Sequence, residues 1–282
     1  MAKRVSIAFA VLAVLCIGAV FGAGEYLSSP APRAVGEAPP ELYATPLLIP
    51  YQGGRAAGWI ARGAGSGAVL LLHGVRADRR QMQERALFLN RLGYSVLLID
   101  LAAHGESTGK RITFGAREAD GVRAALAYLR RNLRGERIGV IGSSLGGAAL
   151  LLSKPVVDAV VLEAVYPTIE DAVANRLRMR GGAPAALLAP LLLHQLPLRT
   201  GVSLAALRPA DAIAHLASPV LVAGGSSDLH TGADETRRLF AAARGPKELW
   251  IVKGAAHVDF HAFAKAEYEQ KVGAFLARHL RP

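Results

Sequence analysis

A hydroxyl side chain within a run of small residues, midway along the chain, has the setting of a catalytic nucleophile. Residues 142–146 read Gly-Ser-Ser-Leu-Gly, so that Ser144 has a glycine two positions away on each side. A nucleophile held on a sharp turn between a strand and a helix adopts strained backbone angles and needs small neighbours. Gly142 and Gly146 therefore predict a nucleophile turn around Ser144.

Three other interpretations of this stretch fit less well. Aligned on Ser143 the pattern fails, because Ile141 and Leu145 would occupy the glycine positions. A phosphate-binding loop needs Lys followed by Ser or Thr after its last glycine, where this chain has Ala148-Ala149. A dinucleotide-binding loop needs the spacing G-x-G-x-x-G, which the stretch does not have.

A serine nucleophile needs a base, and the base needs an acid that orients it. Asp228 follows the apolar run "PVLVAGG", and His257 follows "LWIVKG". One helix and one strand are expected between these two residues, which places both at the carboxyl ends of adjacent parallel strands, on the same sheet edge as Ser144. The order Ser, acid, His also agrees with a nucleophile turn of this type. We therefore predict Ser144 as nucleophile, His257 as base and Asp228 as the orienting acid.

Other acidic and histidine residues compete for these roles. Asp234 begins an expected helix, so we interpret it as a surface or capping residue. His230 could line the site, although a solvated loop histidine is the favoured interpretation. His261 is expected to face elsewhere. His194 and His215, in or beside the irregular segment described below, are candidates for substrate contact.

An acyl-transfer site also needs two N–H donors for the oxyanion of the tetrahedral intermediate. The apolar run at residues 68–72 is followed by His73-Gly74, after which the backbone is expected to turn toward the nucleophile. We predict an oxyanion hole formed by the Val75 N–H and the Leu145 N–H, the latter at the start of a helix. His73 is then expected to have a structural role, hydrogen-bonded within its loop.

The apolar pattern predicts the elements that position these residues. Strands and helices alternate to the end of the chain, which predicts an α/β fold with a mainly parallel sheet and helices on both faces. A hairpin that turns at Gly53-Gly54 is expected to precede them. The expected strands cover residues 68–74, 94–100, 137–142, 158–166, 218–225 and 247–254.

Residues 168 to about 215 interrupt this alternation, because they contain no convincing strand. Several short helices are expected there, broken at Gly181, Gly182, Pro184, Pro190 and Pro197. The run "AALLAPLLLHQL" is strongly apolar but too short to span a membrane. We predict a helical cap over one end of the sheet, which favours ester or lipid-like acyl substrates over charged ones. Ordinary packed helices with no role in substrate choice are the alternative.

Residues 1–24 are predicted to be a membrane anchor or a signal peptide. Lys3 and Arg4 precede an uncharged stretch over residues 5–24, about the length that a helix needs to cross the hydrocarbon core. The positive flank predicts that the rest of the chain is exported. An uncleaved anchor is favoured over cleavage after residues 22–24, which would release a secreted protein. Lipid attachment at Cys16 is disfavoured, because a bulky leucine precedes it.

The rest of the composition limits the other possibilities. Residues 25–44 are rich in Pro and Ala and are predicted to be an extended linker to a domain over residues 45–282. The net charge of +11 could indicate nucleic acid or an anionic membrane, but the arginines are scattered without a basic aromatic motif, so we predict no nucleic-acid partner. The single cysteine excludes an intramolecular disulfide and a Cys-based metal cluster.

Taken together, these motifs resemble the α/β-hydrolase superfamily, and most of all its monoacylglycerol-lipase-like and prolyl-aminopeptidase-like branch. The matching pieces are "HGVRADR", "GYSVLLIDLAAHGES", "VIGSSLGG", "PVLVAGGSSD" and "GAAH", which span nearly all of residues 45–282. The resemblance implies the α/β-hydrolase fold, the same three catalytic residues, and a cap between the sixth and seventh core strands. Ala102-Ala103 departs from the Arg-Gly or Pro-Gly of many relatives, which weakens any inference about the substrate branch.

The sequence thus predicts a membrane-tethered or exported serine hydrolase that cleaves carboxylic esters through an acyl-enzyme on Ser144, without a metal or an organic cofactor. Its expected partners are a small, apolar acyl substrate and, through the N-terminal helix, a membrane. A peptidase or acyltransferase that uses the same three residues is one alternative. A catalytically silent binding protein is another.

Overall fold

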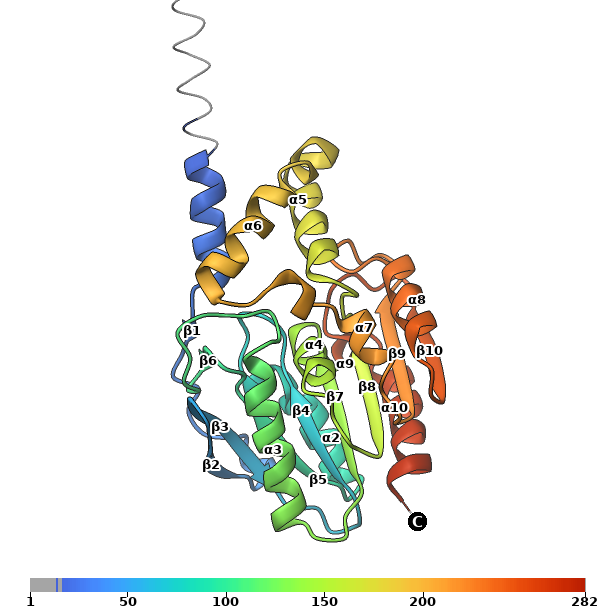
Figure 1. The fold of residues 1–282 in the computed structure, drawn as a ribbon. Helices are drawn as coiled ribbons and strands as arrows, with labels where there is room; N and C mark the ends of the chain where they lie inside the picture. Colours follow the sequence, from blue (N-terminus) through green and yellow to red (C-terminus); the bar gives the residue numbers. More distant parts are fainter. Residues whose placement is uncertain (1–13, 15–16, 282) are drawn as a thin grey trace, which may run out of the picture.

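The computed structural model describes all residues except 1–13, 15, 16 and 282. Its centre is an eight-stranded sheet with the order β10-β9-β8-β7-β4-β5-β3-β2 (Figure 1). The strands are β2 (Thr45–Tyr51), β3 (Gly54–Ala61), β4 (Ala68–Leu72), β5 (Ser95–Ile99), β7 (Ile138–Ser143), β8 (Ala159–Glu163), β9 (Val220–Gly225) and β10 (Lys247–Val252). Pairing is antiparallel from β2 to β3 and from β3 to β5, and parallel throughout the rest, which confirms the predicted mainly parallel sheet.

Helices cover both faces of this sheet, as the alternating pattern predicts. One layer holds α2 (Gln83–Arg91), α9 (Phe260–Phe263) and α10 (Lys265–Leu280), and the other holds α3 (Glu118–Asn132), α4 (Leu145–Leu152), α7 (Pro209–Ile213) and α8 (Ala233–Ala242). Along β4, Leu70 and Leu72 pack toward the second layer, whereas Val69 and Leu71 pack toward the first. Both faces of the sheet are therefore buried, and this is why its central strands are continuous apolar runs.

The segment between β8 and β9, the sixth and seventh strands of the large sheet in chain order, forms the cap. It contains two longer helices, α5 (Ile169–Ala186) and α6 (Ala189–Thr200), followed by the short 3₁₀ helix η3 (Leu204–Ala206). The prediction of several short helices is right in part, because α5 and α6 are longer than expected. Gly181 and Gly182 kink α5 as expected, but Pro190 lies in the first turn of α6 and Pro197 lies within that helix. A proline in the first turn breaks no intrahelical hydrogen bond, so Pro190 begins the helix instead of interrupting it.

The N-terminal helix, defined here as residues 17–28, lies beside α6 (Figure 1). Arg199 of α6 donates to the Phe21 carbonyl at 2.8 Å and forms an ion pair with Glu25. No helix among the described residues is both long enough and apolar enough to cross a membrane. Most of the predicted anchor, residues 5–24, lies outside the described part of the chain.

The predicted linker, residues 25–44, differs from the free tether that its composition indicates. Within it, β1 (Ala31–Pro32) pairs in parallel with β6 (His104–Gly105), and the 3₁₀ helix η1 (Pro40–Leu42) follows. Val35 and Leu42 are buried on the face of the sheet that α2 covers. A Pro-rich sequence favours an extended backbone, but it does not show whether that backbone pairs with a distant loop.

Candidate active site

Ser144 occupies the sharp turn that the sequence predicts, between the end of β7 and the start of α4. Its φ of 48° and ψ of −110° lie in a region that side chains rarely adopt. The Ser144 N–H donates to the Glu163 carbonyl at 2.7 Å, and the Ser144 carbonyl accepts from the Ala148 N–H at 3.1 Å. The strained turn is therefore held on both sides, by the neighbouring strand and by the following helix.

The glycines of the motif are required by close backbone approaches. A Cβ at Gly142 would lie 2.6 Å from the Cα of Gly147, and a Cβ at Gly146 would lie 2.5 Å from the carbonyl oxygen of Leu72. Either contact would displace the backbone around the serine. A Cβ at Gly147 would also collide with Val165, a requirement that the five-residue pattern does not include. The small neighbours thus let β7, α4 and the end of β4 meet around Ser144.

Asp228 and His257 form the predicted acid–histidine pair at the same sheet edge. They lie in the loops that follow β9 and β10, with His257 Nδ1 2.7 Å from Asp228 Oδ2. Asp228 Oδ1 accepts hydrogen bonds from the backbone N–H groups of His230 at 2.7 Å and Thr231 at 2.9 Å. The carboxylate is buried and uses both oxygens, so it is oriented to hold the imidazole through Nδ1.

Ser144 and His257 line one small cavity of about 240 Å³, together with Gly74 and Val75. Because Nδ1 of His257 faces Asp228, Nε2 is the ring nitrogen that remains for proton transfer. No hydrogen bond joins the hydroxyl of Ser144 to this ring in the part of the chain that the structure describes. Catalytic hydrogen bonds are often long in ligand-free enzymes and tighten when substrate binds.

Both predicted oxyanion donors belong to residues of the larger cavity in front of Ser144, which has a volume of about 310 Å³. Leu145 is the first residue of α4, where the N–H has no intrahelical acceptor. Val75 follows Gly74, whose N–H donates to Gln81 Oε1 at 2.7 Å. That bond holds the loop after β4 near the nucleophile, since a Cβ at Gly74 would lie 3.8 Å from the Ser144 Cβ.

Two buried histidines, His73 and His104, hold the loops around the site. For His73 this is the structural role that the sequence predicts. Its Nδ1 lies 2.7 Å from the Gly74 carbonyl oxygen, and its Nε2 accepts from the Leu101 N–H at 3.0 Å. Burial lowers the pKa of His73 to about 4 and that of the adjacent His104 to about 4, so both rings are neutral near pH 7. They support the loops after β4 and β5.

Four of the competing residues lie away from the site. Asp234 is in the first turn of α8 and its side chain is 99% exposed. His261 is buried on the far side of the sheet against Glu269, with Nε2 3.1 Å from Oε1. His194 is exposed on α6, and His215 lines a separate cavity next to α7.

His230 corrects the prediction of a solvated loop histidine. It is half-buried, lines both cavities beside Ser144, and its ring centroid is 4.8 Å from that of His257. Burial and the nearby His257 lower the pKa of His230. The alternative interpretation, that His230 lines the site, is therefore the correct one.

Asp228, His230 and His257 together have the side-chain chemistry of a metal site, with ligand atoms within 4.8 Å of one another. The fit is poor, because both Asp228 oxygens already accept hydrogen bonds and His257 Nδ1 is bound to one of them. The arrangement is instead that of an acid that fixes the orientation of a base.

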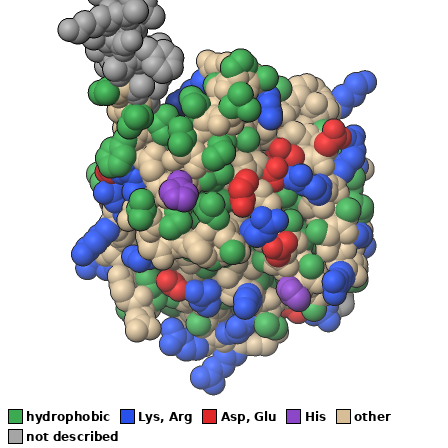
Figure 2. All heavy atoms as spheres, turned by 45° about the horizontal axis from the view of Figure 1, so that its top comes forward, with side chains coloured by type: hydrophobic (Ala, Val, Ile, Leu, Met, Phe, Trp, Pro, Cys, Tyr) green, Lys and Arg blue, Asp and Glu red, His purple; other side chains and the backbone are tan. Residues whose placement is uncertain are grey.

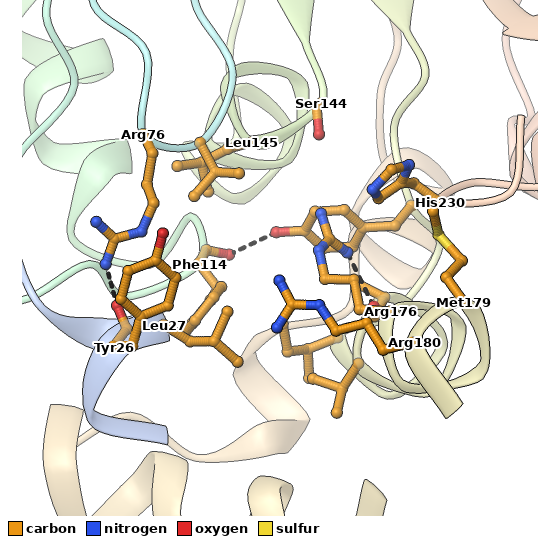
Figure 3. A pocket seen from close by; sticks show the side chains of 15 residues that line it. Tyr26, Leu27, Arg76, Phe114, Ser144, Leu145, Arg176, Met179, Arg180 and His230 are labelled. Carbon is orange, nitrogen blue, oxygen red and sulfur yellow. Dashed lines mark hydrogen bonds between the residues drawn. The ribbon is translucent and has the colours of Figure 1, made fainter. Parts of the chain in front are cut away.

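The larger cavity has residues that the sequence did not single out (Figure 3). Its outer wall comes from α5 and from the N-terminal helix, which places Tyr26 and Leu27 in the same cavity as Ser144 although the sequence predicts them to be in the linker. The Tyr166 hydroxyl donates to the Phe114 carbonyl at 3.0 Å across the cavity floor. The full set of lining residues is Tyr26, Leu27, Val75, Arg76, Phe114, Ser144, Leu145, Tyr166, Ile169, Ala172, Val173, Arg176, Met179, Arg180 and His230.

A buried ion pair behind the site joins the nucleophile and base loops. Arg85 of α2 contacts Glu163 Oε2 at 2.7 Å, and both side chains are 2% exposed. Arg85 also contacts Asp259 at 2.7 Å, two residues after His257. Because the Glu163 carbonyl accepts the Ser144 N–H, this one guanidinium supports both halves of the site.

Comparison with known proteins finds similar chains. The model of the alpha/beta hydrolase family matches residues 69–270. An uncharacterized Bacillus subtilis protein, YqkD, is 29% identical over 216 residues, covering 74% of this chain and 70% of its own length. An uncharacterized Mycobacterium tuberculosis protein, Rv2307c, is 32% identical over 222 residues, covering 76% of this chain and 72% of its own.

Solved structures share the fold. The Pyrococcus furiosus esterase Pf2001 superposes with a TM-score of 0.76 at 23% identity, covering 90% of this chain and 98% of that one. An Exiguobacterium antarcticum esterase superposes with a TM-score of 0.60 at 15% identity, covering 82% of this chain and 99% of that one. The match over residues 69–270 takes in most of the chain, and the sheet with its capped edge has the family's architecture. The chain therefore belongs to the alpha/beta hydrolase family.

Proposed function

We propose that this protein is a serine hydrolase that cleaves carboxylic esters through an acyl-enzyme on Ser144. The observation that carries the proposal is the strained turn that presents Ser144 to the same cavity as His257, whose ring is held by a buried carboxylate. Strain of this kind persists where function needs it, because it costs of order 1–3 kcal/mol. The named esterases among the similar folds support the choice of esters.

In the proposed mechanism, His257 Nε2 removes the hydroxyl proton as Ser144 Oγ attacks the acyl carbonyl. The Val75 and Leu145 N–H groups stabilise the oxyanion, and Asp228 stabilises the imidazolium. The C–O bond of the ester then breaks, and the alcohol leaves with the proton from His257. Water, deprotonated by the same ring, attacks the acyl group and releases the acid, which restores the Ser144 hydroxyl.

Two adjacent serines provide a sharp test. With p-nitrophenyl butyrate as substrate, Ser144→Ala should lower kcat by at least about 10³-fold, because a residual rate from the remaining site is all that survives loss of a nucleophile. Ser143→Ala, which removes the neighbouring hydroxyl, should retain most of the activity. Comparable rates for wild type and Ser144→Ala would overturn the proposal. Faster turnover of an aminoacyl p-nitroanilide than of the ester would indicate a peptidase instead.

We also propose that the N-terminal segment tethers the enzyme to a membrane, with the catalytic domain on the exported side. Exposed apolar side chains surround the place where the N-terminal helix meets α6, including Phe21, Leu191 and Leu198. Figure 2 shows hydrophobic side chains gathered at this end of the molecule. The full chain should stay in the membrane pellet after an alkaline carbonate wash, and complete release would contradict the tether. Mass spectrometry of the N-terminus separates an anchor from a cleaved signal peptide.

A further inference from the structure

The cavity in front of Ser144 has an unbalanced charge. Among the residues that the structure describes, three arginines line it, Arg76, Arg176 and Arg180, and no acidic residue does. Arg176 and Arg180 come from the same helix, α5, one turn apart, and Arg76 comes from the loop after β4 (Figure 3). The remaining wall is mostly apolar and aromatic, so these guanidinium groups face little competing polar surface.

Arg176 is the arginine nearest the chemistry. It lines both the larger cavity and the smaller one that contains Ser144 and His257, whose acidic lining residues, Glu163 and Asp259, are both paired with Arg85. Its guanidinium donates to the Ala172 carbonyl at 2.8 Å, and it forms no ion pair with a carboxylate among the described residues. Arg176 is half-buried, and this burial lowers the pKa of its guanidinium. A charge in this position is costly unless an anion compensates it.

The two buried arginines, Arg79 and Arg85, differ from Arg176 in their partners. Arg79 is paired with Asp100 and Glu106, and Arg85 is paired with Glu163 and Asp259. In the described chain, therefore, the arginines of the core have carboxylate partners, whereas Arg176 of the cavity has none. The carboxylates of Asp228 and Glu235 act on Arg176 only from beyond ion-pair distance, so an anion bound in the cavity would give it a direct partner.

The other two arginines extend this positive surface. The guanidinium of Arg180 points into the cavity from α5 in Figure 3 and also has no ion-pair partner in the described structure. Arg76 lies over the Tyr26 ring, 4.1 Å from the centroid, and donates to backbone and hydroxyl oxygens of the N-terminal helix and the residue that follows it. Within the described part of the chain, Arg76 therefore has polar partners but no negative one.

We propose that the cavity recognises esters that carry an anionic group, a carboxylate or a phosphate, with Arg176 as its principal contact. The proposal rests on the proposed hydrolase function of Ser144 and names its substrate class. The apolar wall would hold the hydrocarbon part of an anionic amphiphile while Arg176 holds the charged end beside Ser144. This differs from the expectation of uncharged substrates, which followed from the apolar cap alone.

A matched pair of esters tests the substrate class. The wild type should hydrolyse mono-p-nitrophenyl succinate with a higher kcat/KM than p-nitrophenyl butyrate, which has an acyl chain of the same length without the charge. In Arg176→Met this preference should fall by about 10- to 100-fold, the range expected for a lost hydrogen bond to a charged group. Arg176→Lys should restore part of it. Arg178→Met, which removes an arginine of α5 that does not line the cavity, should leave the preference unchanged.

A binding measurement separates this proposal from the proposed reaction. Titration of Ser144→Ala with octyl phosphate, 1-octanol and inorganic phosphate requires no turnover. Octyl phosphate should bind at least about tenfold more tightly than either of the others, and Arg176→Met in the same background should remove most of that advantage. Equal binding of octyl phosphate and octanol would overturn the anion site even if Ser144 is the nucleophile. If inorganic phosphate binds as tightly as octyl phosphate, the cavity binds free phosphate, and the proposal that it recognises an anionic amphiphile is overturned.

Discussion

The cavity in front of Ser144 has two walls that are held in different ways. The sheet wall consists of the loops after β4, β7 and β9, and the cap wall consists of α5 and the N-terminal helix. On the sheet side, Ser144 and Asp228 are buried and fixed by hydrogen bonds to the backbone of adjacent loops. On the cap side, the N-terminal helix is attached through Glu25, whose side chain is 48% exposed, to Arg199 and Arg111. Buried, hydrogen-bonded groups are costly to displace, whereas exposed ion pairs contribute only about 0–1 kcal/mol each.

This difference separates the chemistry from the choice of substrate. The sheet wall tolerates little change, because its glycines and its strained serine are constrained by backbone contacts. The cap wall presents Leu27, Met179 and Arg180 from helices whose outer faces are in solvent. Substitutions on the sheet side should therefore abolish turnover, and substitutions on the cap side should change which ester is used.

The largest effect is expected at the orienting acid. Asp228→Asn should lower kcat by roughly 10⁴-fold, because an amide in place of the carboxylate favours the wrong tautomer of His257. Asp234→Asn is the matched control, since this exposed carboxylate on α8 lies outside the site, and it should keep wild-type kinetics. Steady-state hydrolysis of p-nitrophenyl butyrate distinguishes them, and equal losses in the two variants would refute the assignment.

The next largest effect is expected behind the site, at Arg85. Arg85→Met leaves Glu163 buried without its cation, which should lower the free energy of unfolding by about 3–5 kcal/mol. Activity should fall too, since Arg85 also supports the loop that carries His257. Arg91→Met on the same helix removes an arginine whose side chain is 61% exposed, and it should cost less than about 1 kcal/mol. Urea unfolding measures the free energy of unfolding of both variants. Equal values for Arg85→Met and Arg91→Met would show that the buried ion pair does not stabilise the fold.

Acid should weaken the sheet wall through its buried histidines. The pKa of His104 in the fold is lowered to about 4 from the ordinary value of 6.5, so the unfolded chain binds more protons between these values and stability falls as the pH decreases through this window. Between pH 7 and pH 5 the loss is about 2 kcal/mol for each such ring, and His73 contributes similarly.

His104→Leu should accordingly reduce the difference in unfolding free energy between pH 7 and pH 5 by about 2 kcal/mol. His194→Leu, at an exposed position of the cap, should leave that difference as it is in the wild type. Urea titrations at the two pH values measure the change. An identical pH dependence in His104→Leu and wild type would show that this ring does not weaken the fold in acid.

The smallest effect is expected from the cap wall, where Leu27 enters the cavity from the N-terminal helix. Leu27→Trp should narrow the cavity of about 310 Å³ and lower kcat/KM for p-nitrophenyl octanoate about tenfold relative to the acetate, about 1.4 kcal/mol. Leu198→Trp provides the control, because Leu198 is 83% exposed on α6 and lines no part of the cavity. If the ratio of kcat/KM for the octanoate to that for the acetate is the same in Leu27→Trp and in the wild type, the acyl chain does not bind against Leu27.

The same contrast explains what could be predicted from the sequence. Ser144 could be found because a nucleophile turn needs glycines at fixed, local positions. Asp228 and His257 could be placed because each follows a strand, and parallel strands end at one edge. The hairpin was predicted within one residue, since its two-residue loop is Gln52-Gly53.

The cap wall could not be predicted in this way. Tyr26 and Leu27 reach the cavity because the N-terminal helix packs on α6, which is more than 160 residues later in the chain, and no local pattern encodes that contact. The lack of a carboxylate partner at Arg176 could not be predicted either, because a sequence does not show which arginines form ion pairs. Pairing of β1 with β6 was missed for the same reason.

Covalent trapping would identify the nucleophile without relying on kinetics. The full-length protein would be treated with a fluorophosphonate and digested, and the modified peptide would be sequenced by mass spectrometry. We expect one phosphonylated residue, Ser144, with labelling lost in Ser144→Ala and retained in Ser143→Ala. Labelling at another residue, or undiminished labelling of Ser144→Ala, would contradict it.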